Sequence, residues 1–242
     1  MGAQWKNANK AANSAVKGAL IHKVTKEIQV AAKLGGAEIS HNARLRAAVE
    51  VAKKISVSKD TIERAIRKGA GLDKDGVDYE TVLFEGFAPH QVALIVECLT
   101  DNKNRTSSSI KSKFTKGGTL GSPGSVGWMF DRLGVIEAKS PGTEADPESD
   151  AIEAGAQDVK MVMTEASEDE TSVPAAQFLT EPQDLDHVSK SLAAKGWQIL
   201  SSELSYIAKD KVPLTDAQRG EVEEFLNRID GDDDVHRIYV AL

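Results

Sequence analysis

Residues 91–99 read QVALIVECL, and this short stretch decides the architecture of the middle of the chain. Its five consecutive apolar residues, Val92 to Val96, are typical of a central strand that is buried on both faces of a sheet. Residues 79–86 read as another strand, joined to it by a turn at Ala88-Pro89-His90. The pattern therefore predicts a hairpin. We expect Cys98, the single cysteine of the chain, to be a small buried hydrophobe within it.

Before the hairpin, residues 6–69 are predicted to form helices. At about 100° per residue, three lysines share one helical face, opposite a stripe of alanines. The apolar stripe changes phase after Gly18, which predicts a break or a new helix there, and Gly35-Gly36 ends the segment. The lysines are Lys6, Lys10 and Lys17, and the alanines are Ala8, Ala12, Ala15 and Ala19.

Two shorter helices are predicted to follow, with Asn42 and Ser58 as their N-caps and Gly69 as the stop of the second. Their apolar spacing predicts a buried stripe on each, and basic residues of the first turn to solvent. The inward residues are Leu45, Ala48, Val49, Ala52, Ile62, Ala65 and Ile66, and the outward ones are Arg44, Arg46, Lys53 and Lys54.

After the hairpin, a helix is predicted over residues 103–116, followed by the glycine-rich connection GGTLGSPGS at 117–125. The segments 126–130 (VGWMF) and 134–138 (GVIEA) read as separate strands, and residues 140–150 as a polar linker. Residues 151–208 then give a helix, two strands, a helix and a strand.

The C-terminal segment has a clear helical signature, because Thr215 can cap a helix with an apolar stripe at Val222, Phe225, Leu226 and Ile229. We interpret the acidic run 230–234 as a solvated turn before a last strand. The predicted fold class is α+β, with an N-terminal helical domain followed by two small α/β sandwich domains of split-βαβ type.

The charge of the chain is unevenly distributed. The formal net charge is −7, but residues 1–75 hold 15 Lys and Arg against 7 Asp and Glu. This segment therefore carries +8 and the rest −15, an asymmetry typical of a module that binds a polyanion. Lysines that only solvate helix faces remain an alternative. We expect no membrane-spanning segment and no secretory signal, and a single cysteine fits a reducing, cytoplasmic location.

Motifs for catalysis or metal binding are missing from the sequence. The five histidines stand singly, and the acidic run 230–234 has its glycine in the wrong place for a calcium loop. The glycine-rich segment leads into a strand and lacks the Gly-Lys-Ser/Thr ending of a nucleotide-binding loop. We therefore expect no enzyme activity, no metal, no cofactor and no small-molecule substrate.

A second basic island lies at residues 102–116, NKNRTSSSIKSKFTK, which contains five Lys and Arg and no acid. Such a mixture suits phosphate contacts without reading of base sequence. The alternative is an amphipathic helix that packs through Ile110 and Phe114. Asn104 and Thr106 would then only cap this helix, and the glycines of 117–125 would only supply turns. Trp128 and Phe130 alternate along the predicted strand, which favours core positions over base stacking.

Several long segments resemble the YebC/PmpR family, which includes the mitochondrial translational activator of cytochrome c oxidase subunit I. These segments are NARLRAAVEVAKK (42–54), FEGFAP (84–89), VECLTDNKNRT (96–106), GGTLGSPGSVGWMF (117–130) and Gly134-Val135-Ile136. The resemblance implies a helical domain at 1–75, an α/β domain at 76–131 and 206–242, and an α/β domain at 132–205 inserted into it. Many members open with Gly-His-Ser-Lys-Trp, whereas this chain opens with Gly-Ala-Gln-Trp-Lys.

The resemblance implies a DNA-binding transcriptional regulator, or else a translation factor that acts on ribosomes at proline-rich stalls. We predict a non-enzymatic protein that binds duplex DNA or ribosomal RNA, with a protein-interaction scaffold as a further alternative. Arg105 could contact phosphate in a bidentate manner, and glycines let a ligand approach the backbone closely. The candidate contact residues are Trp5, Lys6, Lys10, Lys17, Arg44, Arg46, Lys103, Asn104, Arg105, Thr106, Lys111, Lys113, Lys116, Gly117, Gly118, Gly121, Gly124 and Ser125.

Overall fold

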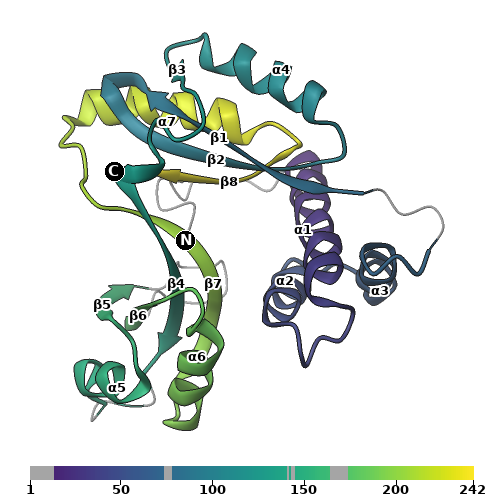
Figure 1. Ribbon diagram of the computed structural model, residues 1–242, viewed down its shortest axis with the longest axis vertical. Helices are drawn as coiled ribbons and strands as arrows, with labels where there is room; N and C mark the ends of the chain where they lie inside the picture. The colour runs from purple at the N-terminus through teal and green to yellow at the C-terminus, as the bar shows by residue number, and fades with distance from the viewer. Residues whose placement is uncertain (1–13, 74–77, 141, 143–144, 164–173) are drawn as a thin grey trace. The chain divides into compact units, whose positions relative to one another are not determined.

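The computed structural model describes residues 14–73, 78–140, 142, 145–163 and 174–242 (Figure 1). The chain divides into two compact units, one formed by residues up to Asp131 together with Tyr206–Leu242, the other by Arg132–Ser205. No helix in the described ranges is long and apolar enough to cross a membrane. The fold class is α+β, as the sequence predicts, with helices followed by two four-stranded sheets.

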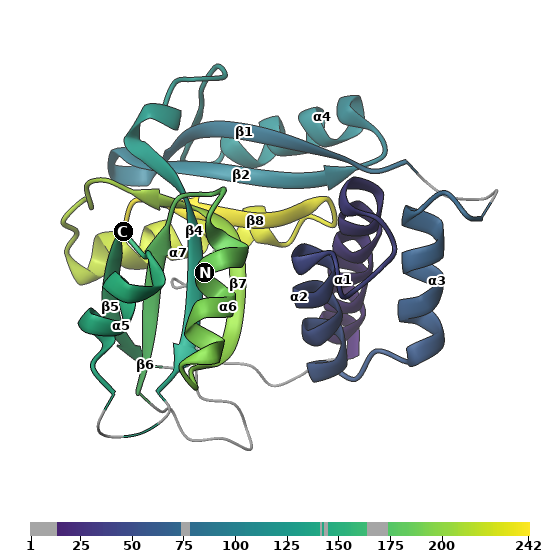
Figure 2. The same cartoon turned by 60° about the horizontal axis from the view of Figure 1, so that its bottom comes forward.

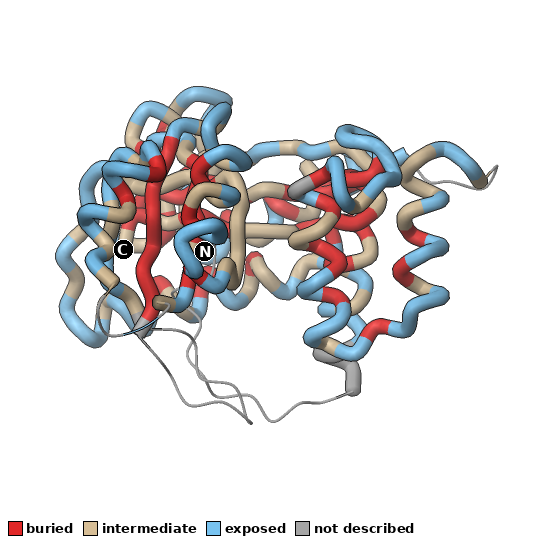
Figure 3. Tube along the Cα trace, turned by 90° about the horizontal axis from the view of Figure 1, so that it is seen from below, coloured by how far each residue is buried: buried red, intermediate tan, exposed pale blue. Residues whose placement is uncertain are grey.

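Three helices begin the first unit: α1 (Ser14–Gly35), α2 (Ala43–Lys54) and α3 (Lys59–Gly69). Their contacting faces bury the stripes that the spacing predicts, so that buried and exposed residues alternate along each helix (Figure 3). Asn42 and Ser58 cap α2 and α3 as expected, each accepting a backbone N–H three residues ahead. The fully or nearly buried members are Val24, Ile28, Ala31, Ala32, Leu45, Ala48, Val49, Ala52, Val57, Ile62 and Ala65.

The predicted break near Gly18 is wrong, because α1 runs through this residue without interruption. A glycine inside a helix costs only about 1 kcal/mol relative to alanine, and the packing of α1 against α2 and α3 outweighs that cost. No atom lies within 4 Å of the place where a side chain at Gly18 would begin. The change of stripe phase therefore marks where α1 starts to pack against the other helices. Residues 6–13 lie outside the described part of the chain.

Gly69 ends α3 as predicted, but its main role is to let two helices approach each other. A Cβ atom at this position would lie only 2.2 Å from the carbonyl oxygen of Gln29 in α1. The left-handed conformation that usually follows a helix is taken by Gly71, whose φ is 70°. The glycine at position 69 is thus required by packing rather than by backbone conformation.

The first sheet has the strand order β3-β1-β2-β8 and contains the predicted hairpin. Strands β1 (Glu80–Ala88) and β2 (Val92–Thr100) pair along their whole length, with Glu80 opposite Thr100 and Ala88 opposite Val92. The short β3 (Thr119–Leu120) pairs with the end of β1, and β8 (Val235–Val240) pairs with β2. The apolar run therefore forms a central strand, as expected.

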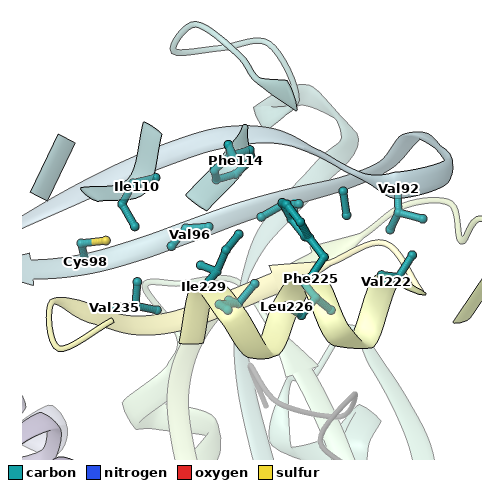
Figure 4. Packing of buried hydrophobic residues seen from close by; sticks show 13 residues of the cluster. Val92, Val96, Cys98, Ile110, Phe114, Val222, Phe225, Leu226, Ile229 and Val235 are labelled. Carbon is teal, nitrogen blue, oxygen red and sulfur yellow. The ribbon is translucent and has the colours of Figure 1, made fainter. Parts of the chain in front are cut away.

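Both faces of β2 are covered. On one face, α4 (Lys103–Phe114) and α7 (Asp216–Asp230) pack over Val92, Leu94, Val96 and Cys98, so the cysteine is buried as predicted (Figure 4). The rings of Phe114 and Phe225 meet edge to face, with centroids 5.5 Å apart. On the other face, Ala93 and Ile95 contact a second cluster. The partners in that cluster include Val126, Phe130, Tyr239 and Ala241.

The segment VGWMF at 126–130 is not a strand, contrary to the prediction. Gly127–Met129 form a single 3-10 turn, and one strand, β4 (Phe130–Lys139), runs on through residues 131–133. Phe130 is buried as expected, whereas Trp128 is 69% exposed and does not belong to the core. The turn lets Val126 and Phe130 point into the same apolar cluster while Trp128, which lies between them, stays exposed. On a regular strand all three side chains would share one face.

The second sheet has the order β5-β6-β4-β7 and carries α5 (Pro147–Ala154) and α6 (Leu185–Ala194) (Figure 2). Its remaining strands are β5 (Asp158–Met163), β6 (Pro174–Thr180) and β7 (Gln198–Ala208). The polar linker predicted at 140–150 is shorter than expected, because Asp146 caps α5 and Pro147 begins it. The rings of Phe178 and Trp197 meet in its core, 5.0 Å apart.

The two glycine environments on α1 and α3 predict opposite effects of the same substitution. Gly18→Ala should raise the free energy of unfolding by about 0.5–1 kcal/mol, because alanine is the better helix former and the site is open. Gly69→Ala should lower it by about 1–3 kcal/mol, because the new methyl group meets the backbone of Gln29. Urea unfolding followed by circular dichroism measures both. Shifts in the same direction would contradict this account.

Candidate nucleic-acid interface

The second basic island forms α4, and its two sides differ. The inward side packs through Thr106, Ile110 and Phe114, which are four residues apart and fully buried. Asn102, rather than Asn104 or Thr106, caps the helix, since its side chain accepts the N–H of Arg105 at 3.1 Å. The alternative reading as a packed amphipathic helix therefore holds for this side. Its other side, with Asn104 among its residues, is exposed.

A buried carboxylate, Asp234, holds α4 against α1. Its Oδ1 lies 2.8 Å from Nζ of Lys26, and its Oδ2 lies 2.8 Å from Nη2 of Arg105. The hydroxyl of Thr106 donates to the same Oδ2 at 2.8 Å. Burial alone would raise the pKa of Asp234, but the hydrogen bonds from Lys26, Arg105 and Thr106 outweigh it and lower that pKa to about 2. Asp234 is thus ionised and paired.

The acidic run 230–234 is therefore not simply a solvated turn, as the sequence suggested. Asp234 is only 5% exposed, and Asp232 accepts a hydrogen bond from Ser109 of α4. Asp230 pairs with Lys23 of α1 at 3.2 Å. The run supplies three carboxylates to basic and hydroxyl groups from α1 and α4, which lie far away in the sequence.

Arg105 takes part in this internal network and still reaches solvent. Besides Asp234, its Nη2 contacts Asp101 at 2.8 Å. The bonds to Asp101 and Asp234 come from Nε and Nη2 of Arg105, and none comes from Nη1. The side chain is 54% exposed. Arg105 can therefore bind the acidic turn and offer a donor to an outside group at the same time.

The remaining basic residues of the stretch 102–116 fall into two groups: Lys103 and Lys113 have partners within the described part of the protein, and Lys111 and Lys116 do not. Lys113 donates to the carbonyl of Arg228 at 3.0 Å, and Lys103 lies 2.7 Å from Glu80 in an exposed pair. Lys111 and Lys116 are exposed, and neither side chain makes an ion pair or hydrogen bond within the described ranges. Their charges are therefore available to a partner.

The glycine-rich loop already contains an anion, the carboxylate of Glu85 in β1. The N–H of Gly124 donates to its Oε1 at 2.8 Å, and those of Val126 and Gly127 donate to its Oε2 at 2.8 and 2.7 Å. Burial raises the pKa of Glu85, but these three bonds outweigh it and lower that pKa. The loop N–H groups that could have cradled a phosphate are thus occupied from within.

The loop glycines serve packing and backbone conformation. A Cβ at Gly118 would lie 2.4 Å from the ring of Phe225, and one at Gly121 would lie 2.2 Å from Oγ of Ser125. Gly117 and Gly124 have φ values of 107° and 87°, which glycine adopts without strain. Ser125 Oγ is itself buried without a hydrogen-bond partner. None of these features requires a ligand.

The candidates in the helical region are less concentrated than the sequence suggested. Arg44 makes a bidentate pair with Glu27, at 2.6 and 3.0 Å, and His236 Nε2 lies 3.1 Å from the same carboxylate. Burial opposes ionisation of Glu27, but the bonds from His236 and Arg44 outweigh it and lower its pKa. Arg46 is partly exposed and donates to a nearby carbonyl. Trp5, Lys6, Lys10 and the side chain of Lys17 lie outside the described part.

A cleft of about 560 Å³ opens beside the Asp234 network and contains Arg105 and Lys113 among the predicted residues. Its walls also carry Lys26 and four aspartates, Asp101 and Asp232–Asp234, which the sequence reasoning did not assign to a site. The sequence indicated these aspartates only indirectly, through the acidic run 230–234 in a chain whose residues 1–75 are positively charged. Within the described residues, no group of three or more His, Cys, Asp or Glu could hold a metal ion.

Two family models and several full-length relatives match this chain. A model of the TACO1/YebC protein N-terminal domain matches residues 2–72, and one of the TACO1/YebC second and third domain matches residues 79–242. A probable transcriptional regulatory protein of Pseudomonas fluorescens is 50% identical, covering 100% of this chain and 99% of the relative. Another, from Bdellovibrio bacteriovorus, is 46% identical over the full length of both.

A solved structure shows the same similarity. The crystal structure of a conserved hypothetical protein from Aquifex aeolicus matches with a TM-score of 0.78 at 37% sequence identity. The match covers 99% of this chain and 95% of that one.

The lowered pKa of Asp234 predicts how stability depends on pH. The pKa of an aspartate is ordinarily about 3.9. The ionised Asp234 therefore contributes stability that is fully present above about pH 4 and is lost as the pH falls toward about 2. Asp234→Asn should be less stable than the parent at neutral pH, and the gap should narrow across that range. Thermal unfolding at stepped pH measures it.

The matched control is Glu63→Gln, which alters an exposed carboxylate of α3 that lies 3.6 Å from Lys59. Exposed pairs contribute little, so this variant should follow the parent within about 0.5 kcal/mol at every pH. A stability gap for Asp234→Asn that stays constant down to about pH 2 would contradict the assignment.

Proposed function

The chain belongs to the TACO1/YebC family, and from this membership and the charges of α4 we propose that it is a non-enzymatic regulator of gene expression that binds nucleic acid. Its named relatives are probable transcriptional regulatory proteins. The observation that carries the proposal is a pair of free lysines in the acid-free stretch 102–116: Lys111 on the exposed side of α4, and Lys116 two residues after its end. Such a protein works where DNA and ribosomes are, in the cytoplasm.

The surface that we propose for contact is the outer side of α4 together with Lys116, two residues after its end. Lys111 and Lys116 provide uncompensated charge, and Lys103 gives up only an exposed pair with Glu80 when a phosphate competes for it. Arg105 adds the donor Nη1 that its internal bonds leave over, and Asn104 adds an exposed amide. Thr106 is buried and supports this surface without contacting the ligand.

Phosphate contact explains these residues better than base readout does. A recognition helix must present side chains into a groove along one face. The inner face of α4 is fixed to the sheet through Ile110 and Phe114, and its outer residues are mainly lysine and serine. Such residues position a protein on a nucleic-acid backbone and carry no sequence information. We propose that Lys6, Lys10, Lys17 and Trp5 also contact nucleic acid, and that the target is duplex DNA or structured RNA.

The proposal predicts a loss of salt dependence when the free lysines are removed. Lys111→Ala combined with Lys116→Ala should reduce the slope of log affinity against log salt for duplex DNA by about 1.8, which corresponds to about 0.9 per phosphate contact. Fluorescence anisotropy over a series of salt concentrations measures the slope. The fold should be kept, because exposed substitutions change stability by about ±0.5 kcal/mol.

Lys190→Ala is the matched control, because this exposed lysine of α6 pairs with Asp186 and belongs to neither basic island. It should leave the slope unchanged. Equal slopes for all three proteins would refute the α4 surface, and parent affinity independent of salt would favour a protein-interaction scaffold. Parallel titrations with duplex DNA and with ribosomal RNA show which target is preferred.

A further inference from the structure

One aromatic side chain stands out from the rest of the molecule. Among the aromatic residues that the structure describes, Trp128 alone is exposed, with an exposed fraction of 69%. It lies in the 3-10 turn Gly127–Met129, between Val126 and Phe130, both of which are buried. The turn is thus anchored in the core on both sides of the indole, and the indole is fixed in position at the surface.

Hydrogen bonds make this position rigid. The carboxylate of Glu85 accepts the N–H groups of Gly124, Val126 and Gly127 and so ties the loop before the turn to strand β1. The indole Nε1 of Trp128 donates to the carbonyl of Ser125 at 3.1 Å. This is the only hydrogen-bond donor of a tryptophan side chain. A partner of Trp128 therefore meets the flat faces of the ring.

The loop stretch 122–125, just before the turn, carries no large apolar side chain. The exposed residues just before it in the loop are Ser122, Pro123 and Gly124. The other exposed large apolar side chains of the described ranges, which include Leu20, Leu72 and Leu83, come from other segments. A tryptophan at the centre of a protein interface is normally enclosed by contacts that exclude water. A base-stacking platform needs only one accessible aromatic face.

Two lysines lie next to the turn, on either side of the exposed Asp210 in the sequence. The N–H of Lys209 donates to the carbonyl of Met129 at 3.0 Å, which places the segment of Lys209 and the exposed Lys211 alongside it. Lys209 makes one half-exposed ion pair, with Asp131 at 3.3 Å. The N–H groups of Gly124, Val126 and Gly127 are not open to phosphates, because the Glu85 carboxylate accepts them. Lysines beside an aromatic face are the combination found where single strands bind.

We propose that Trp128 is a stacking platform for an unpaired nucleobase, and that Lys209 and Lys211 contact the adjoining phosphates. The inference rests on the proposed nucleic-acid function and adds a ligand class to it. Base faces are hidden inside a duplex, so the ligand is a single strand, a loop or a flipped base. The site uses residues outside both basic islands, since these lysines follow β7.

The test uses the full chain and two probes, a short single-stranded RNA and an abasic backbone of the same length. Trp128→Ala should weaken binding of the RNA by about 5- to 150-fold, the range found when a stacking aromatic is replaced. Trp128→Phe should retain most of the affinity, and Ser122→Ala, on the same loop, should equal the parent. All four proteins should bind the abasic backbone alike. A matched single-stranded DNA shows whether the sugar matters.

A second readout follows the indole directly. In a Trp5→Phe background the chain keeps two tryptophans, Trp128 and the buried Trp197. Quenching of emission by the RNA that is present in this background and lost on adding Trp128→Phe then reports on Trp128. Equal RNA affinity for the parent and Trp128→Ala, with duplex binding intact, would overturn the platform alone. Failure of the parent to bind any nucleic acid would overturn the proposed function as well. Quenching by a proline-rich peptide but not by RNA would assign Trp128 to a protein partner and overturn the inference.

Discussion

The pairing of Asp234 with Lys26 and Arg105 is the interaction on which the first unit depends. A carboxylate that is 5% exposed is stable only when its charge is compensated, and here two cations and a hydroxyl compensate it. The partners come from two helices, since Lys26 lies in α1 and both Arg105 and Thr106 lie in α4. One ionised group therefore fixes the start of α4 and the contact of α1 with the sheet.

Local patterns were sufficient where the deciding residues are close in sequence. The apolar run of β2, the cap at Thr215 and the stripe of α7 were all predicted, because each depends on neighbours within one element. Long-range partners were not predictable. Lys26 and Asp234 are 208 positions apart, and nothing in either segment names the other. Gly18 and Trp128 were misjudged for different reasons. Packing against α2 and α3 outweighs the cost of a glycine in α1, whereas a 3-10 turn stands where a strand was expected at Trp128.

Two carboxylates, Asp234 and Glu85, bind basic and N–H groups that would otherwise be available to a partner. Asp234 pairs with Lys26 and Arg105, whose charges would otherwise be available to a nucleic acid. Glu85 accepts the backbone N–H groups of Gly124, Val126 and Gly127. What remains for a partner is smaller than the sequence suggests, and it is better defined. Lys111 and Lys116 carry free charge, Arg105 has a spare donor, and Trp128 offers a ring face. Family membership alone does not separate these residues from their structural neighbours.

The pairing of β8 with β2 has a consequence for the order in which the chain folds. Ile95 and Tyr239 are partners in this ladder, so the central strand waits for a strand that is synthesised much later. The β1–β2 hairpin can form early, but until β8 arrives one edge of β2 stays open and its apolar residues lack the cover of α7. The residues from Arg132 to Ser205 emerge from the ribosome in this interval and can fold first. Completion of the first sheet is then a late event, which requires synthesis through β8.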